Sequence, residues 1–309
     1  MQKERIEKVD KKKIREWLQY VIIGAATISI GAASGVIIKR KWGGEEITYS
    51  GFDPEAFKAD GQALLKEYEK NPKKSFTPAE RVCIGVEKYK NCENSYSVSI
   101  GLADTIVKQT IRNAQIKVGN KYFEEQISRS SMVSMANRVT QEGSAVKMYK
   151  GEAKSDETGK YPKEYTLFKP EDYKSVYGKS PDEMFIYIIS NKTVNLDKCK
   201  TSENKGKIKV FLDLDPDIAT YYYKVQMKGM SNLAGLPVFE YVKLTYTFDS
   251  SMTLLHMKVD EKYKASMAGV TATITNNIDN YYHAGKKIDI PGLNQSLDYN
   301  KLKGDVKYE

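Results

Sequence analysis

The chain has 309 residues and a net charge of +9, a value that raises the question of a nucleic-acid partner. Ten Lys or Arg and four acidic residues lie in residues 1–41, so this segment carries +6 and leaves +3 for residues 42–309. Because the basic charge is concentrated at the N-terminus, we expect no nucleic-acid binding. Residues 42–309 are long enough for one large or two small domains.

A hydrophobic segment over residues 17–42 predicts a transmembrane anchor. Between residues 18 and 38 it contains no charged residue, proline or histidine. At about 1.5 Å per residue, its length matches the roughly 30 Å hydrocarbon core of a bilayer. The apolar run continues to Ile38, past the small residues at 32–35, which favours an uncleaved anchor over a cleaved signal peptide.

The charges around this segment predict its orientation. Seven Lys or Arg precede it and three follow directly. The positive-inside rule therefore predicts a cytoplasmic tail over residues 1–16 and an extracytoplasmic domain after the anchor, with the protein in the cell membrane. Gly31 and Gly35 form a GxxxG pattern that allows two anchors to dimerise, but incidental spacing is the preferred explanation because small residues are common in membrane spans.

Residues 43–92 are predicted to be a helical segment that packs on a sheet. Asp53 and Pro54 form an N-cap and first turn of a helix that ends at Asn71. A second helix starts at Thr77, which forms a capping box with Glu80, and continues to about residue 89.

Residues 93–290 are predicted to form an antiparallel half-barrel domain, because apolar and polar residues alternate with a period of two in several of its stretches. Apolar residues alternate with serines from 95 to 102, which predicts a strand with one buried face. Gly119 marks a hairpin turn, and further strands are expected near residue 132 and over 145–149. Helices are expected over 170–177 and after Ser180, with a buried strand over 185–189 as the alternative.

The last third is predicted to be mainly sheet. A strand over 207–214 precedes a helix that starts at Asp215, and three strands follow at about 242–248, 255–263 and 270–282. In the second of these strands Leu255 is expected on the buried face. Residues 291–309 show no periodicity and are predicted to be a surface tail.

This order of elements resembles the half-barrel proteins typified by the LolA carrier and the LppX-type mycobacterial lipoproteins. The resemblance rests on residues 215–282, notably VFEYVKLTYTFDSSMTLLHMKVDEKY, and on residues 95–150. It implies an α+β fold in which a curved antiparallel sheet, a half-barrel, packs against helices and holds acyl chains or lipoproteins in its concavity. The present chain differs because its anchor lacks a lipid-carrying cysteine.

We therefore predict a non-enzymatic, membrane-anchored binding protein for a lipid or lipopeptide. Helical phase or strand alternation places six candidate lining residues on apolar faces: Tyr222, Val225, Tyr246, Phe248, Met257 and Tyr263. One alternative is an interaction module that binds another protein of the cell envelope. A second is a hydrolase that uses Asp213 and Asp215, although Asp215 is better explained as a helix cap.

No cofactor or metal site is expected. The chain has no CxxC motif, and its two histidines, His256 and His283, are predicted to be exposed. Its three cysteines are predicted to be free thiols, with Cys92 and Cys199 as the alternative disulfide pair.

Overall fold

The computed structural model describes residues 53–304, apart from 106–107, 132–133, 178–179, 184, 231–234 and 268–269. The predicted cytoplasmic tail and anchor, including Gly31 and Gly35, lie outside the described residues. Within the described part of the chain, no helix is long and apolar enough to cross a membrane.

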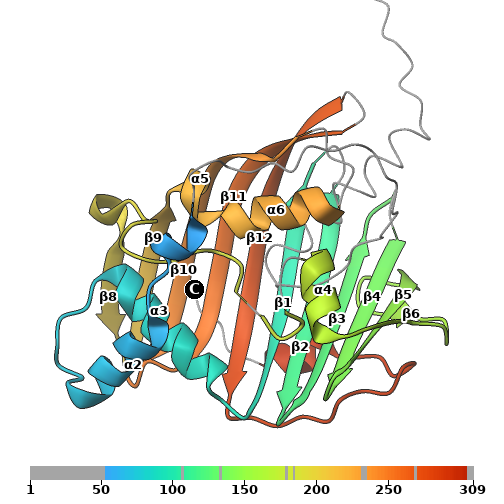
Figure 1. Ribbon diagram of the computed structural model, residues 1–309, viewed down its shortest axis with the longest axis horizontal. Helices are drawn as coiled ribbons and strands as arrows, with labels where there is room; N and C mark the ends of the chain where they lie inside the picture. The colour runs from blue at the N-terminus through green and yellow to red at the C-terminus, as the bar shows by residue number, and fades with distance from the viewer. Residues whose placement is uncertain are drawn as a thin grey trace, which may run out of the picture.

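The fold is built on one open, antiparallel, twelve-stranded sheet with helices across one face (Figure 1). The strand order is β6-β5-β4-β3-β2-β1-β12-β11-β10-β9-β8, and β7 pairs with β5. The strands are β1 (Asn94–Asp104), β2 (Lys108–Val118), β3 (Lys121–Arg129), β4 (Ser134–Glu142), β5 (Ala145–Ala153), β6 (Gly159–Lys160), β7 (Thr166–Phe168), β8 (Lys200–Asn204), β9 (Lys207–Leu214), β10 (Val238–Asp249), β11 (Leu254–Met267) and β12 (Val270–Ala284). The predicted α+β arrangement and the meander of β10, β11 and β12 are confirmed.

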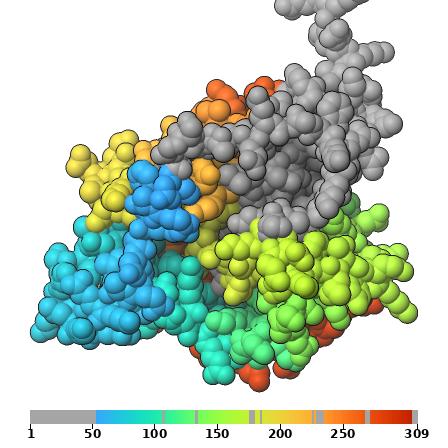
Figure 2. Space-filling view, in the orientation of Figure 1, coloured from blue at the N-terminus to red at the C-terminus, as the bar shows by residue number. Residues whose placement is uncertain are grey.

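Most of the helices lie on the same face of this sheet, and α2, α3 and α4 form much of the surface seen in Figure 2. The helices are η1 (Pro54–Phe57), α2 (Gly61–Lys70), α3 (Pro78–Lys90), α4 (Pro170–Tyr177), η2 (Leu196–Lys198), α5 (Pro216–Ala219), α6 (Tyr221–Met230) and α7 (Tyr299–Lys303). The predicted capping box is present, because Thr77 Oγ1 accepts from Glu80 N at 3.2 Å and Glu80 Oε2 accepts from Thr77 N at 2.8 Å.

Two helices predicted to be continuous are interrupted. The first divides into η1 and α2 because Asp60 starts a new helix by accepting from Ala63 N at 2.9 Å. The second divides into α5 and α6 at Thr220, whose hydroxyl donates to the Pro216 carbonyl. In both cases a local polar side chain satisfies the backbone groups of a helix end.

The main core lies between α3 and strands β9 to β12. Val82 and Ile84 of α3 are fully buried, as are Leu212 of β9 and Leu244 of β10. Gly85 lets the helix approach the ring of Phe248 so closely that a Cβ at this position would lie 2.1 Å from a ring carbon.

The opposite face of β1 to β4 is covered by the C-terminal tail, which lies at the surface as predicted but is anchored to the sheet by single buried side chains. Tyr299 of α7 is fully buried against Val98 and Ile127 of the sheet. Arg138 of β4 donates to the carbonyls of Gly292 and Leu293 at 2.7 and 2.6 Å, which ties the tail to the strand. The tail has no periodicity because its place depends on these single contacts. The predicted boundaries at residues 92 and 290 stay predictions.

Both faces of β1 are consequently covered. Ser97 and Ser99, predicted to face solvent, are 4% and 2% exposed. They lie on the helix side of the sheet, where Ser97 Oγ donates to Gln115 at 3.3 Å and Ser99 Oγ donates to Asn280 at 2.6 Å. Alternation located the two faces of the strand correctly but did not show that a second layer covers the polar one.

The pairing of β10 with β11 also differs from the prediction. A register shift between Thr247 and Phe248 pairs Phe248 with Leu254. Leu254 is therefore fully buried, whereas Leu255, predicted to be buried, is only partly so. Such a bulge moves one residue out of the strict period of two.

Candidate functional site

A segment without regular structure, residues 185–190, crosses the helix side of the sheet, and we refer to it as the strap. The predictions of a helix or a strand here are both wrong. The strap is held by three contacts: Ile188 N donates to the Ala219 carbonyl at 3.0 Å, Cys83 Sγ donates to the Ile189 carbonyl at 3.3 Å, and Tyr187 donates to Glu261 at 2.6 Å. These partners come from α5, α3 and β11, so the path of the strap depends on tertiary contacts.

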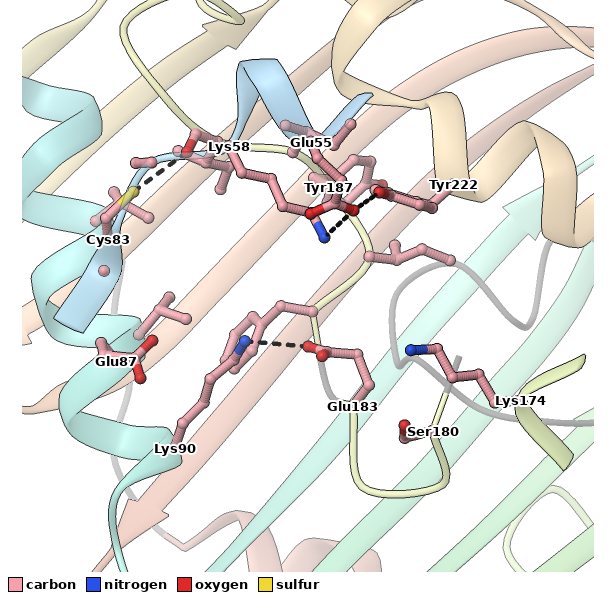
Figure 3. Close-up of a pocket in the computed structure, with 18 residues that line it drawn as sticks. Glu55, Lys58, Cys83, Glu87, Lys90, Lys174, Ser180, Glu183, Tyr187 and Tyr222 are labelled. Carbon is pink, nitrogen blue, oxygen red and sulfur yellow. Dashed lines mark hydrogen bonds and ion pairs between the residues drawn. The ribbon is translucent and has the colours of Figure 1, made fainter. Parts of the chain in front are cut away.

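A cavity of about 350 Å³ lies between the strap, η1, α3 and the start of α6 (Figure 3). Its volume is at the lower end of the roughly 300 to 1,000 Å³ typical of ligand sites. It is lined by Glu55, Lys58, Ala59, Gly61, Val82, Cys83, Val86, Glu87, Lys90, Lys174, Ser180, Glu183, Phe185, Ile186, Tyr187, Ile188, Ile189 and Tyr222.

Apolar side chains of α3 and the strap form one part of this lining. Val82 and Val86 lie one helical turn apart on α3, and Ile186 of the strap is buried beside the same space. Phe185 stacks on Tyr282 of β12 with ring centroids 5.9 Å apart. Phe185 of the strap therefore contacts both the sheet, through Tyr282, and the cavity, which it lines together with Ile186.

Polar and charged side chains in and just after η1 and at the start of α6 form a second part of the lining. Lys58 Nζ lies 2.8 Å from Glu55 and 4.6 Å from the centre of the Tyr222 ring, and Tyr222 donates its hydroxyl to Glu55. The hydrogen bonds from Lys58 and then Tyr222 lower the pKa of Glu55. Burial, together with the bond to Glu55, raises the pKa of the Tyr222 phenol. The Glu55 carboxylate is thus compensated within this part of the lining by Lys58 and Tyr222.

A second ion pair closes the opposite side of the cavity. Lys90 Nζ of α3 lies 3.1 Å from Glu183, and both side chains are more than a third exposed. Lys174 of α4 points its ammonium group towards the same space (Figure 3). The cavity thus joins apolar walls to a rim that carries both signs of charge, which suits an amphipathic molecule.

Cys83 places a thiol at the cavity. Burial is the main cause that raises its pKa to about 12. Reactive cysteines have a lowered pKa because the thiolate is the nucleophile. The Cys83 thiol is therefore protonated at neutral pH, and its role in the structure is to donate to the strap.

Beneath the strap lies a buried carboxylate, Glu261 of β11. It is fully buried and accepts from Tyr187 Oη at 2.6 Å and from Asn276 Nδ2 at 2.7 Å. Burial raises its pKa to about 7, although these two hydrogen bonds oppose the shift. This acid lies directly behind Tyr187, which lines the cavity.

The six predicted lining residues occupy different places. Tyr222 lines the cavity, and the side chain of Val225 lies outside the described residues. The other four belong to the packed core beneath the helices: Tyr246, Phe248, Met257 and Tyr263. Their contact with a ligand stays a prediction.

The other sequence candidates lie apart from this cavity. Asp215 caps α5 by accepting from Asp217 N at 2.9 Å, as predicted, and Asp213 accepts from Asn195. His256, predicted to be exposed, is 4% exposed because it packs beside Tyr281, and its Nε2 lies 3.0 Å from Asp279.

His283, also predicted to be exposed, is half-buried and stacks on Tyr96 with ring centroids 4.2 Å apart. Burial lowers its pKa to about 4. Cys83, Cys92 and Cys199 are free thiols, so the alternative pairing of Cys92 with Cys199 is wrong. Within the described ranges no cluster of His, Cys, Asp or Glu is suited to a metal ion.

Most of the cavity lining was missed from the sequence. The apolar run FIYII at residues 185–189 was the available signal, but its length fitted a strand or a helix equally well. Lys58, Lys90 and Lys174 carry no motif. They meet because η1, α3 and α4 pack over the same face of the sheet.

No protein-family model and no curated protein sequence matches this chain. A solved structure with some similarity is that of a LolA superfamily protein from Nitrosomonas europaea. It shares 9% identity, with 70% of this chain and 96% of that chain covered and a TM-score of 0.24. The resemblance described for residues 95–150 and 215–282 is to LolA-type proteins as well.

Proposed function

We propose that this protein is a non-enzymatic, membrane-anchored binding protein that holds a single-chain amphipathic ligand, such as a lipid or lipopeptide, outside the cytoplasm. The observation that supports this most directly is the cavity between α3 and the strap. Apolar walls accept a hydrocarbon chain, and the compensated charges of the rim accept a polar end.

The size of the cavity narrows the ligand class. At about 350 Å³ it accommodates one chain or the lipidated end of a peptide more readily than a lipid with several chains. The Cys83 thiol is protonated, and the carboxylates of Glu55 and Glu183 form ion pairs with Lys58 and Lys90. These groups favour a role in binding over one in nucleophilic attack. The interaction module predicted as an alternative stays a prediction.

The test is native mass spectrometry of the full chain, purified from cells in detergent. It compares the amount of co-purified lipid on the wild-type chain and on the variant Val86→Trp. The indole would occupy the cavity beside α3, and we expect lipid occupancy to fall about tenfold, equivalent to about 1.4 kcal/mol. Val238→Trp is the matched control because Val238 is 63% exposed and outside the cavity. Equal loading of both variants, or no lipid on the wild-type chain, would refute the proposal.

The location outside the cytoplasm requires its own test. A C-terminal fusion to an enzyme that is active only outside the cytoplasm should be active, because the seven cations before the anchor retain the N-terminus inside. A silent fusion that is nevertheless produced in full length would place the domain in the cytoplasm.

A further inference from the structure

A second cleft, of about 530 Å³, lies at the end of the molecule formed by β8, β9 and the loop between α2 and α3, at the left of Figure 1. It shares no residue with the candidate cavity. Its lining comes from the end of α2, the α2–α3 loop, the start of α3, the β8–β9 hairpin and the β10–β11 turn. We refer to it as the basic cleft.

The lining of the basic cleft is strongly positive. Five cationic side chains, from Lys73, Lys74, Arg81, Lys205 and Lys207, face it together with a single carboxylate, that of Glu203. This contrasts with the ligand cavity, where cations and carboxylates balance. Because residues 42–309 carry a charge of only +3, the excess in the basic cleft is a local feature and not a reflection of the average composition.

The existing ion pairs neutralise only part of this charge. Lys74 pairs with Glu67, and Arg81 Nη1 lies 3.6 Å from Glu203. Lys73 and Lys205 are exposed and form no ion pair with another described residue. Two cations on different segments are therefore available to one bound anion.

Backbone geometry also distinguishes this cleft. Two non-glycine residues with positive φ lie in the described part of the chain, Lys205 at 48° and Met252 at 62°, and both line the cleft. Lys205 and Gly206 form the tight turn between β8 and β9, where Asn or Gly is the favoured first residue. The strained position places the lysine at the tip of the hairpin, beside the α2–α3 loop.

The second strained residue is supported by its own turn. Asp249 Oδ1 accepts from Ser251 N at 2.9 Å and from Thr253 N at 2.8 Å, which fixes the turn between β10 and β11. Met252 is 2% exposed within it. The floor of the basic cleft is thus held by the hydrogen bonds of this turn, and the cations surround it from three separate segments.

From this arrangement we propose that the basic cleft binds phosphate groups. Several adjacent cations around a concave, polar site match an anion of high charge density, such as a chain of phosphates or the head groups of anionic phospholipids. This site is independent of the proposed ligand cavity, so either proposal can fail without the other.

The test compares two variants of the full chain in nanodiscs of phosphatidylcholine. Lys73→Gln/Lys205→Gln removes two charges from the cleft, and Lys286→Gln/Lys287→Gln removes two exposed charges elsewhere. The basic N-terminal tail is the same in both. Calorimetry with inorganic tripolyphosphate tests a free phosphate source, and co-flotation with vesicles containing phosphatidylglycerol tests a lipid source.

We expect the cleft variant to weaken binding about tenfold in at least one arm, and the control variant to leave it unchanged. Binding in the tripolyphosphate arm identifies a free phosphate, and binding in the vesicle arm alone identifies a head group. No binding in either arm, or equal weakening by both variants, overturns the proposal. Tighter binding of oligothymidylate than of tripolyphosphate also overturns it, because the cleft would then recognise nucleic acid.

Discussion

At the scale of single residues, Gly85 determines how closely α3 approaches the sheet. A Cβ at this position would lie 2.1 and 2.6 Å from two ring atoms of the buried Phe248. Gly85→Ala should therefore destabilise the fold by about 1 to 3 kcal/mol, although alanine favours a helix by about 1 kcal/mol. Thermal unfolding followed by circular dichroism measures this loss.

The control for this variant is Gly292→Ala, because a Cβ there meets nothing within 4 Å. In the double variant with Phe248→Leu, the smaller side chain should relieve the clash, so the two losses should not add. Full additivity would show that Phe248 is not the cause.

A second residue, Glu261, predicts a pH dependence of stability. Burial raises its pKa from 4.5 to about 7, so between these values the Glu261 side chain binds more protons in the folded chain than in the unfolded chain. The contribution of Glu261 to the free energy of unfolding should then be fully present below about pH 4.5 and be lost as the pH rises through 7. Glu261→Gln should reduce this loss by about 2 to 3 kcal/mol.

Urea unfolding at pH 5 and pH 7.5 checks the effect. The control is Glu240→Gln on the neighbouring strand, since lysine partners lower the pKa of Glu240 and keep its titration below this window. The interpretation fails if Glu261→Gln leaves the difference between the two pH values unchanged.

At the scale of elements, the C-terminal tail depends on a buried cluster on β3 and β4. Arg138 and Glu125 are 2% and 1% exposed and form an ion pair, and Tyr161 and Tyr299 donate to Glu125 at 2.8 and 3.0 Å. Arg138→Met should cost about 3 to 5 kcal/mol, because it leaves the Glu125 carboxylate buried without its cation. The tail should also become more sensitive to protease, because Arg138 binds its carbonyls.

Urea unfolding and limited proteolysis measure these two effects. Lys121→Met is the matched control, because Lys121 and its partner Glu142 are 50% and 72% exposed and their pair contributes less than about 1 kcal/mol. Adding Glu125→Gln to Arg138→Met should restore part of the loss. An Arg138 variant as stable as the Lys121 variant would contradict this account.

At the scale of the whole molecule, the two halves of the sheet carry their main apolar clusters on opposite faces. Strands β9 to β12 bury apolar residues such as Leu212 and Ile278 under the helices, whereas β1 to β4 bury Val98 and Ala114 under the tail. A chain that ends at residue 290 should therefore expose an apolar surface on β1 to β4, melt at a lower temperature and bind the dye ANS. Unchanged melting without dye binding would mean that the tail is dispensable.

Part of the order of elements followed from the sequence because caps, turns and alternation act over a few residues. The capping box of Thr77 with Glu80, the turn at Gly119 and the alternation in β10 are examples, and each is present in the structure. Tertiary structure alone decided what covers each face. Arg138 meets Gln295 across 157 positions, and the strap reaches Cys83 across 106. No local pattern encodes such contacts, because they depend on which layers pack together, and the cavity exists only where these distant segments meet.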